Sequence, residues 1–329
     1  NSDSAIVIWY SELVEIENSN ITVSDLGGIR LFRSKNITVN EGVINNCGIG
    51  IFIAETSDVV VSSATIESNI YFDILLLSAS NVWIINNEIK VSFEGVSIID
   101  LLGSSYFENI SISNNLIEGD ATNNALFGIK VLLNEEGSSI KNMVAKNNRM
   151  DNISHGTAVM PTKGIALNMT IYNNTISYSS SYGILLKGNI RNVNITMNNV
   201  SESYRGIYME RINGSVVVRN VLHNNVYGII VNESYDNLIY ENCFLNNSIQ
   251  AYNIGNNFWD NGSYGNFWDD YIGYDENNDG IGDVQYSISE NGTDNFPLIY
   301  CFILNDKSPP MIFLTASIMN NSIVSEDVI

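Results

Sequence analysis

Residues 183–231 repeat one short pattern three times, as Gly183-Ile184-Leu185-Leu186, Gly206-Ile207-Tyr208-Met209 and Gly228-Ile229-Ile230-Val231. The pattern also occurs earlier, as Gly28-Ile29-Arg30-Leu31, Gly50-Ile51-Phe52-Ile53 and, with Asp in place of Gly, Asp73-Ile74-Leu75-Leu76. A period of roughly 22 residues is typical of stacked-repeat proteins, in which each repeat buries its apolar side chains against the next. The pattern therefore predicts a solenoid.

Between these motifs, stretches such as Asn109-Ile110-Ser111-Ile112-Ser113 alternate apolar and polar residues. Alternation of this kind is typical of short, half-buried strands, which must pair with the equivalent strand of the next repeat. The simplest result is an all-β chain folded as a right-handed parallel β-helix, about 50 Å long for roughly ten rungs. Residues 118–139 and 151–163 interrupt the spacing, and we interpret them as tolerated insertions.

One asparagine recurs at the same phase of the repeat, two positions before an apolar residue. These asparagines are Asn87, Asn115, Asn148, Asn174, Asn198, Asn220 and Asn242. We expect each at a bend, where Asn tolerates left-handed backbone geometry, and we expect their stacked amides to bond one another as a ladder. The alternative is that Asn is abundant here and simply favours turns.

The composition excludes some partners. The 329-residue chain has a formal net charge of −21, with 15 Lys plus Arg, and this charge would repel nucleic-acid phosphates. No run approaches the roughly 20 apolar residues of a membrane helix, so no transmembrane segment is predicted. The chain begins at Asn1 and reads as a processed or partial chain, so the lack of a signal peptide carries no weight.

The three cysteines lack the spacing of a metal site. Cys47 lies near one end of the predicted rod and Cys243 near the other, which disfavours a bridge between them. A bridge between Cys243 and Cys301 and a pair of buried free thiols are both open interpretations.

Acceptor sites for N-glycosylation are frequent. The sequence Asn-x-Ser/Thr occurs at Asn20, Asn36, Asn109, Asn152, Asn168, Asn173, Asn194, Asn199, Asn213, Asn232, Asn246, Asn261, Asn291 and Asn320. An Asn-rich and Ser-rich chain would produce roughly half this number by chance, so the excess suggests covalent N-glycans. Glycosylation would place the chain outside the cell, secreted or at the surface, and the acidic composition agrees.

Residues 275–283 have the ligand spacing of a calcium loop. The candidate ligands are Asp275, Asn277, Asp279, Ile281 (through its carbonyl) and Asp283. Oxygen atoms at alternate positions suit a hard cation such as Ca²⁺. Tyr286 stands where an EF-hand has a bidentate Glu, so a shorter extracellular type of loop is predicted. The alternative is an acidic turn rich in Asn and Gly.

The segment from Asn253 onward carries further motifs, namely Asn256-Asn257-Phe258-Trp259, Gly265-Asn266-Phe267-Trp268-Asp269-Asp270-Tyr271-Ile272-Gly273 and Asp294-Asn295-Phe296-Pro297-Leu298. With the calcium-like loop, these resemble the closing segment of NosD-like β-helix proteins, which are abundant among the secreted proteins of archaea. The repeats resemble the carbohydrate-binding and sugar-hydrolase (CASH) repeat group, and the resemblance covers about residues 28–299. It implies a right-handed β-helix with an aromatic-rich, metal-stabilised cap, in which Trp259 and Trp268 cover the last rung.

This resemblance and the repeats predict three parts. Residues 1–252 are the β-helix, residues 253–304 are the C-terminal cap with the acidic loop, and residues 305–329 are a linker and the start of an immunoglobulin-like module. The named role of NosD is maturation of a copper site, which needs clustered His, Cys or Met ligands. His155 and His223 are the only histidines and the methionines are dispersed, so the sequence gives that role no support.

Catalysis has few candidate residues. Glycoside hydrolysis needs two carboxylates facing one bond, whereas Asp73, Glu94 and Asp100 lie at unequal phases of the repeat. Arg205 near Glu202 and Glu210 is the nearest approach to a charged site, and a surface ion pair would explain it equally well. We therefore do not expect an enzyme.

Several tyrosines could stack on sugars or on one another. They are Tyr10, Tyr106, Tyr178, Tyr182, Tyr204, Tyr208 and Tyr227. The sequence favours an extracellular, glycosylated structural or adhesive β-helix in a surface layer, filament or virion appendage. Its partners would be other surface proteins, copies of itself and glycans. A polysaccharide lyase or glycoside hydrolase is the alternative.

Overall fold

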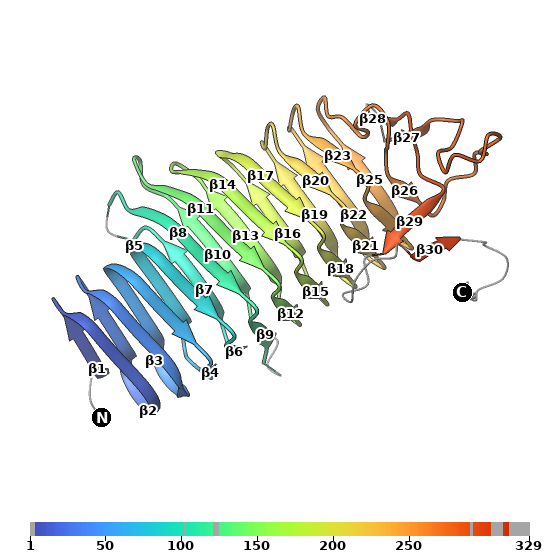
Figure 1. The fold of residues 1–329 in the computed structure, drawn as a ribbon. Coiled ribbons are helices and arrows are strands. Elements are labelled where there is room, and N and C mark those ends of the chain that lie inside the picture. Colours follow the sequence, from blue (N-terminus) through green and yellow to red (C-terminus); the bar gives the residue numbers. More distant parts are fainter. Residues whose placement is uncertain (1–3, 102, 121–124, 290–291, 304–311, 316–329) are drawn as a thin grey trace.

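The computed structural model describes residues 4–101, 103–120, 125–289, 292–303 and 312–315. Within these residues every regular element is a strand, and the strands stack into a rod with β1 at one end and the cap strands at the other (Figure 1). Neighbouring turns are joined by parallel pairing, for example β16 with β19 and β19 with β22. The chain is therefore a parallel β-helix of about 11 turns, as expected from the repeats.

The strands form three faces, and three long strands near the N-terminus run through more than one face. The long strands are β2 (Glu12–Phe32), β3 (Lys35–Ser62) and β5 (Phe72–Ile85). Face 1 also contains β1 (Ser4–Trp9), β7 (Glu94–Ile99), β10 (Phe127–Leu133), β13 (His155–Pro161), β16 (Tyr182–Lys187), β19 (Arg205–Glu210), β22 (Tyr227–Asn232) and β25 (Ile249–Asn253).

The other two faces follow the same order along the rod. Face 2 also contains β8 (Tyr106–Ser113), β11 (Ser139–Lys146), β14 (Ile165–Tyr172), β17 (Ile190–Thr196), β20 (Val216–Val218) and β23 (Leu238–Tyr240). Face 3 also contains β4 (Thr65–Glu67), β6 (Glu88–Val91), β9 (Leu116–Gly119), β12 (Arg149–Asp151), β15 (Thr175–Ser177), β18 (Asn199–Ser201), β21 (Val221–His223), β24 (Cys243–Leu245) and β26 (Phe267–Trp268). The cap adds β27 (Tyr286–Ile288), β28 (Gly292–Asp294), β29 (Tyr300–Ile303) and β30 (Ile312–Thr315).

The core lies inside the coil because alternate side chains of each strand point inward. On β17, Val193 and Ile195 are fully buried while Asn194 between them is exposed. The repeated glycine has a steric cause: a Cβ on Gly206 would lie 2.5 Å from the carbonyl oxygen of Gly228 in the next turn. Such contact is too close for any larger residue without movement of the backbone.

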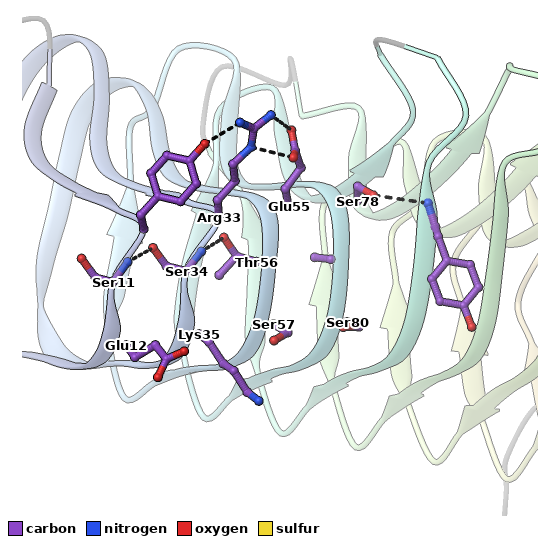
Figure 2. A pocket seen from close by; sticks show the side chains of 13 residues that line it. Ser11, Glu12, Arg33, Ser34, Lys35, Glu55, Thr56, Ser57, Ser78 and Ser80 are labelled. Atoms are coloured by element: carbon purple, nitrogen blue, oxygen red, sulfur yellow. Dashed lines mark hydrogen bonds and ion pairs between the residues drawn. The ribbon is translucent and has the colours of Figure 1, made fainter.

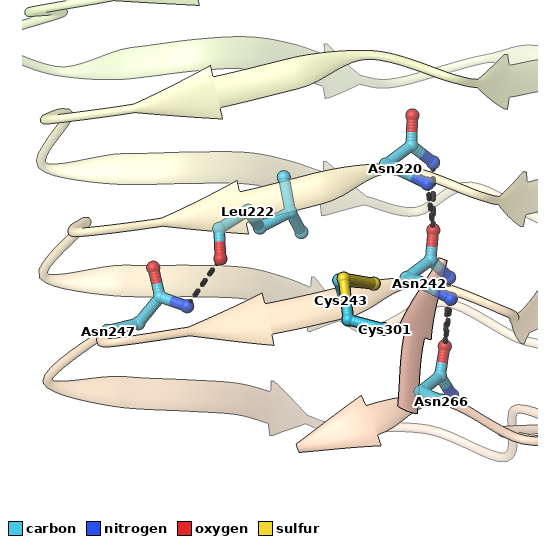
Figure 3. The surroundings of a disulfide bond; sticks show 7 residues. All are labelled: Asn220, Leu222, Asn242, Cys243, Asn247, Asn266 and Cys301. Atoms are coloured by element: carbon cyan, nitrogen blue, oxygen red, sulfur yellow. Dashed lines mark hydrogen bonds between the residues drawn. A yellow bond between two sulfur atoms is a disulfide. The ribbon is translucent and has the colours of Figure 1, made fainter. Parts of the chain in front are cut away.

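The recurring asparagines form one continuous ladder inside the coil. The backbone N–H and Nδ2 of Asn198 both donate to Oδ1 of Asn220 at 2.9 Å, and Asn220 donates in the same way to Asn242. Figure 3 shows this ladder continuing to Asn266, a member that the repeat alignment did not include. The buried amides thus satisfy one another from Asn87 to Asn266.

The expected backbone geometry of these asparagines was wrong. The left-handed residue is the one before each ladder asparagine, as at Met197 (φ 58°) and Arg219 (φ 57°). The physical reason is that the ladder side chain must point inward to reach its neighbours. The exposed or partly exposed residue before it therefore makes the bend.

The two overlong rungs keep a regular strand in addition to their extra residues. Residues 118–139 contain β10 and residues 151–163 contain β13, and these strands pair with each other on face 1. Gly128 and Gly156 occupy the repeated glycine position, since a Cβ on Gly128 would lie 2.8 Å from the carbonyl oxygen of Gly156. Both segments therefore supply ordinary rungs, with extra residues between the strands.

Aromatic rings close the C-terminal end of the core. The Trp268 ring lies between Phe244 and Tyr286, with centroid distances of 4.4 Å and 4.3 Å, and Trp259 is fully buried 5.9 Å away. Stacked rings of this kind cover apolar surface that the last rung would otherwise expose.

A disulfide fastens the end of the chain to the coil. Cys243 on β24 is bonded to Cys301 on β29 (Figure 3), which decides between the two open interpretations. Cys47 is free and buried. Beyond it, β30 pairs antiparallel with β29. The rest of the predicted immunoglobulin-like start, residues 305–311 and 316–329, lies outside the described residues.

Candidate functional site

An open groove lies along the N-terminal third of the rod, where face 1 turns into face 2. It has a volume of about 520 Å³ and crosses successive turns. Its lining residues are Tyr10, Ser11, Glu12, Arg33, Ser34, Lys35, Glu55, Thr56, Ser57, Ser78, Ala79, Ser80 and Tyr106. Figure 2 shows most of these side chains in rows that run along the rod.

The first wall of the groove is a charge-balanced network. The Arg33 guanidinium bonds both carboxylate oxygens of Glu55, at 2.8 Å and 3.3 Å, and donates to the Tyr10 hydroxyl at 2.6 Å (Figure 2). These hydrogen bonds from Arg33 lower the pKa of Tyr10 and of Glu55. The Tyr10 side chain stays 66% exposed. Its ring is therefore available to a ligand, while the charges neutralise each other.

Hydroxyl groups form the floor. The backbone N–H of Ser11 donates to Ser34 Oγ at 3.1 Å, and the backbone N–H of Ser34 donates to Thr56 Oγ1 at 3.4 Å (Figure 2). The positions match because β2 pairs with β3 in register. A row of hydroxyls repeats at the rung spacing of about 4.8 Å. Those of Ser34 and Thr56 are buried and donate to main-chain carbonyl oxygens, whereas the serines at 57, 78 and 80 are partly exposed.

Tyr106 closes the other end. Its backbone N–H donates to Ser78 Oγ at 3.4 Å, and its ring is 44% exposed with Lys141 Nζ 5.7 Å from the ring centroid. Tyr10 and Tyr106 are four rungs apart, about 19 Å at the usual strand spacing. Two exposed rings separated by a hydroxyl floor suit an extended, hydroxyl-rich ligand.

The candidate acids do not converge on this groove. Glu94 accepts from Lys130 Nζ and from Ser97 Oγ, both at 2.6 Å, in a buried cluster on face 1. Asp100 accepts two backbone N–H groups at 2.7 Å, and Asp73 is buried with its pKa raised well above the ordinary value by desolvation. Each carboxyl has a separate structural environment.

A second polar cluster lies further along face 1. Arg205 stands in register between Tyr182 and Tyr227, and its guanidinium lies 4.9 Å from the centroid of Tyr182 and 4.5 Å from that of Tyr204. Glu210 pairs with Lys187 at 3.1 Å. The expected contact of Arg205 with Glu210 is replaced by contacts with tyrosine rings.

The glycosylation acceptor residues lie on the surface. Eleven of the described asparagines of this set are exposed and Asn232 is partly exposed, whereas Asn291 and Asn320 lie outside the described residues. The exposed set is Asn20, Asn36, Asn109, Asn152, Asn168, Asn173, Asn194, Asn199, Asn213, Asn246 and Asn261. The buried ladder asparagines are never acceptors, because the position two residues later is an apolar core residue.

The acidic loop, residues 275–283, is held by hydrogen bonds between its own residues. Asp275 accepts from the backbone N–H groups of Asp279 and Gly280, at 3.2 Å and 2.9 Å, and Asp279 accepts from that of Ile281 at 2.9 Å. Asp283 accepts from the backbone N–H of Glu276 at 2.7 Å. Among the described residues, no group of three His, Cys, Asp or Glu side chains is arranged to hold a metal ion.

Sequence reasoning missed Arg33, Glu55 and Ser78 as groove residues. The signal was present in the sequence, because Tyr10, Arg33, Glu55 and Ser78 recur at the repeat spacing, and the structure adds that all four have positive φ. It also missed Asn266, which follows Asn242 by 24 residues and precedes Trp268 at the phase of a core residue.

The fold and this site define a parallel β-helix with a groove on its surface. The chain belongs to the family described as "Periplasmic copper-binding protein (NosD)", whose model matches residues 103–273. A model described as "Right handed beta helix region" matches residues 4–168 and agrees with the expected hand.

Two curated relatives are similar to parts of the chain. A probable ABC transporter binding protein NosD from Stutzerimonas stutzeri is 30% identical over 141 residues, which are 37% of this chain and 32% of that protein. The Pseudomonas aeruginosa protein of the same name is 38% identical over 60 residues, 18% of this chain and 14% of that one. The chain thus spans about a third or less of these relatives.

Two solved structures are also similar. An exopolygalacturonase from Thermotoga maritima matches with a TM-score of 0.48 and 14% identity, covering 73% of this chain and 55% of that chain. The tailspike protein of E. coli bacteriophage HK620, in complex with a pentasaccharide, matches with a TM-score of 0.49 and 12% identity, covering 74% and 48%. In the described part of the chain, no helix is long and apolar enough to cross a membrane.

The described residues of this chain do not form the copper-binding site that the family description implies. Copper sites cluster His, Cys or Met ligands. His155 stacks between Phe127 and Tyr182, whereas His223 bonds Asn199 on another face. Two of the three cysteines form the disulfide, and the described residues contain no group of three or more His, Cys, Asp or Glu side chains that could hold a metal ion.

Proposed function

We propose that this chain is an exported, N-glycosylated β-helix that serves as a structural or adhesive part of a surface assembly and binds a neutral oligosaccharide in its groove. The observation that carries the binding role is the groove itself, with the exposed rings of Tyr10 and Tyr106 at its ends and the partly exposed Ser57, Ser78 and Ser80 between them. Arg33 is neutralised by Glu55, so a ligand needs no charge of its own.

Three further observations support the location and the assembly role. The described acceptor asparagines are exposed or partly exposed, the formal net charge is −21, and the family description is periplasmic. A rod with sugars on its surface and a disulfide at one end suits an oxidising, extracytoplasmic compartment. Other surface proteins or copies of this chain would be its partners, and Ca²⁺ at residues 275–283 would stabilise the cap.

Binding without cleavage is the proposed activity. Hydrolysis would require two carboxylates acting across one bond; the described groove is lined by Glu12 and Glu55, and Glu55 is committed to Arg33 by two hydrogen bonds, which leaves Glu12. The groove provides stacking surfaces and hydroxyls, which bind a sugar and do not transfer protons to its glycosidic bond.

The test is a binding screen of the disulfide-intact protein against neutral oligosaccharides, followed by calorimetry with the best ligand. We expect Tyr10→Ala and Tyr106→Ala each to weaken binding about tenfold, since each removes a stacking surface. Tyr178→Ala is the matched control for Tyr10→Ala, because both tyrosines are exposed and have positive φ, at 54° and 50°.

The outcomes distinguish binding at the groove from binding elsewhere and from enzymatic cleavage. Equal affinities for Tyr10→Ala and Tyr178→Ala would remove the groove as the site. New reducing ends released from the bound oligosaccharide would establish an enzyme and refute binding alone.

A further inference from the structure

Arg205 is held by aromatic rings on the outer surface of face 1. Its guanidinium lies 4.9 Å from the ring centroid of Tyr182, 4.5 Å from Tyr204 and 5.9 Å from Tyr208. Tyr227 follows Arg205 in register on the next strand, and its ring meets Tyr204 edge to face at 5.9 Å. These contacts fix the position of a planar cation in advance.

No carboxylate balances this cation within the described residues. Arg205 has no ion pair there, and its buried Nε has no hydrogen-bond acceptor. Arg33 shows the contrast, because Glu55 and Tyr10 already use its donors. Arg30 and Arg191 also lack an ion pair among the described residues, and Arg205 differs from them in having a buried Nε without an acceptor.

The acidic residues near Arg205 are committed elsewhere. Glu210 accepts from the Tyr208 hydroxyl at 2.9 Å and pairs with Lys187 at 3.1 Å. Glu202 accepts from Asn224 Nδ2 at 2.9 Å. The buried Nε is covered by protein, so the terminal amino groups of Arg205 are the donors left for an incoming anion.

The surroundings of Arg205 suit a sugar ring. Tyr204 is 43% exposed, and tyrosine faces stack on the apolar faces of sugars. Among β16, β19 and β22, the strands that carry this cluster, Asn232 at the end of β22 is the one glycosylation acceptor. N-glycans on the other faces would leave the cluster open.

We propose that Arg205, with Tyr204 and the neighbouring tyrosines, forms a binding site for a carboxylate-bearing sugar of the uronic acid class. The guanidinium binds the carboxylate by charge-assisted hydrogen bonds, and the exposed Tyr204 ring stacks against the sugar ring. This site lies on β16–β22, away from the groove on β1–β8, and it does not depend on neutral-sugar binding there.

The experiment compares trigalacturonate with its methyl ester, which keeps the rings and removes the negative charges. We expect the wild-type protein to bind the acid at least about tenfold more tightly than the ester, with a preference that falls as salt rises. Arg205→Gln abolishes the preference and Arg205→Lys retains part of it, because Lys keeps the charge without the planar fork. Tyr204→Ala weakens both ligands alike.

Two controls separate a binding role from a structural one. Arg191→Gln changes an exposed arginine on β17 and leaves the preference intact, and circular dichroism of each variant verifies the fold. If Arg205→Gln does not fold, the comparison rests on Arg205→Lys. In that variant the affinity for the acid, divided by the affinity for the ester, must be lower than in the wild type. Equal binding of acid and ester by the wild type, or an unchanged ratio in both Arg205 variants, would overturn the proposal. Equal competition by polyglutamate would overturn the sugar assignment.

Discussion

The backbone N–H of Asn266 donates to Oδ2 of Asp294 at 2.7 Å, so the asparagine ladder ends on a buried carboxyl. The same oxygen accepts from Trp268 Nε1 at 2.9 Å, and Oδ1 accepts from the backbone N–H of Phe296 at 3.0 Å. One side chain of the cap therefore joins the ladder, the aromatic closure and the final segment. The charge state of the Asp294 carboxyl should therefore influence the stability of the cap on the coil.

Burial raises the pKa of Asp294 to about 6 from an ordinary value of 3.8. Between pH 4 and 6 the folded protein therefore holds a proton that the unfolded chain has released, so this contribution to stability is lost as pH rises through 6. We expect the wild type to lose about 2–3 kcal/mol relative to Asp294→Asn between pH 4 and pH 7. Denaturant unfolding of both proteins across this pH range measures the difference in their free energies of unfolding. A difference that does not change with pH would contradict the prediction.

The ladder should carry a large share of the local stability. Asn198→Ala removes the acceptor of two hydrogen bonds from Asn174 and the donor to Asn220, all in the buried interior. We expect a loss of about 2–4 kcal/mol in the free energy of unfolding. Asn194→Ala on an exposed position of the same turn should change it by about 0.5 kcal/mol or less. Similar losses in both variants would show that a ladder asparagine contributes no more to stability than an exposed one.

The disulfide closes a span of 58 residues between Cys243 and Cys301. For a loop of this length the chain-entropy model gives about 4 kcal/mol of stabilisation. We expect Cys301→Ser to lower the melting temperature and to speed proteolysis after residue 253. Cys47→Ala, which changes the free cysteine, should leave cap proteolysis at the wild-type rate. A cap equally resistant without the disulfide would refute its role as a fastener.

Calcium should protect the acidic loop. Without a cation, Asp275, Asp279 and Asp283 place three carboxylates in one short exposed segment, where they repel one another. We expect a chelator to speed cleavage of residues 275–283 by a non-specific protease, and added Ca²⁺ to reverse the effect. Asp279→Ala should remove the response to calcium. Identical cleavage with and without the chelator would leave an acidic turn held by its own hydrogen bonds.

Glycosylation should follow exposure. Mass spectrometry of intact glycopeptides from the native protein should find sugars on exposed acceptors such as Asn109 and Asn168, and none on the ladder asparagines. Both of these acceptors project from face 2. A protein with no occupied acceptor would refute the proposed modification, although the rod would be unchanged.

The sequence by itself determined the coil. The glycine and the apolar residues beside it recur because the backbones of successive turns nearly touch at positions such as Gly206. The inward asparagines recur because each one donates hydrogen bonds to the side-chain oxygen of the asparagine in the next turn. Such constraints repeat at every rung and are therefore visible as a period. The closing role of Trp268 was predictable for the same reason, since an open apolar rung must be covered.

The tertiary structure alone decided the sites and the irregular rungs. β10 and β13 were missed because extra residues shift their position in the sequence, whereas pairing in space restores their register. The groove needs Tyr10 and Tyr106, which lie four rungs apart along the rod, and only the stacked turns show that both rings stay exposed along one groove. The choice between a disulfide and two thiols also depended on where Cys301 returns to β24. Local patterns encode contacts between equivalent residues, while contacts between non-equivalent residues arise only when the coil brings them together.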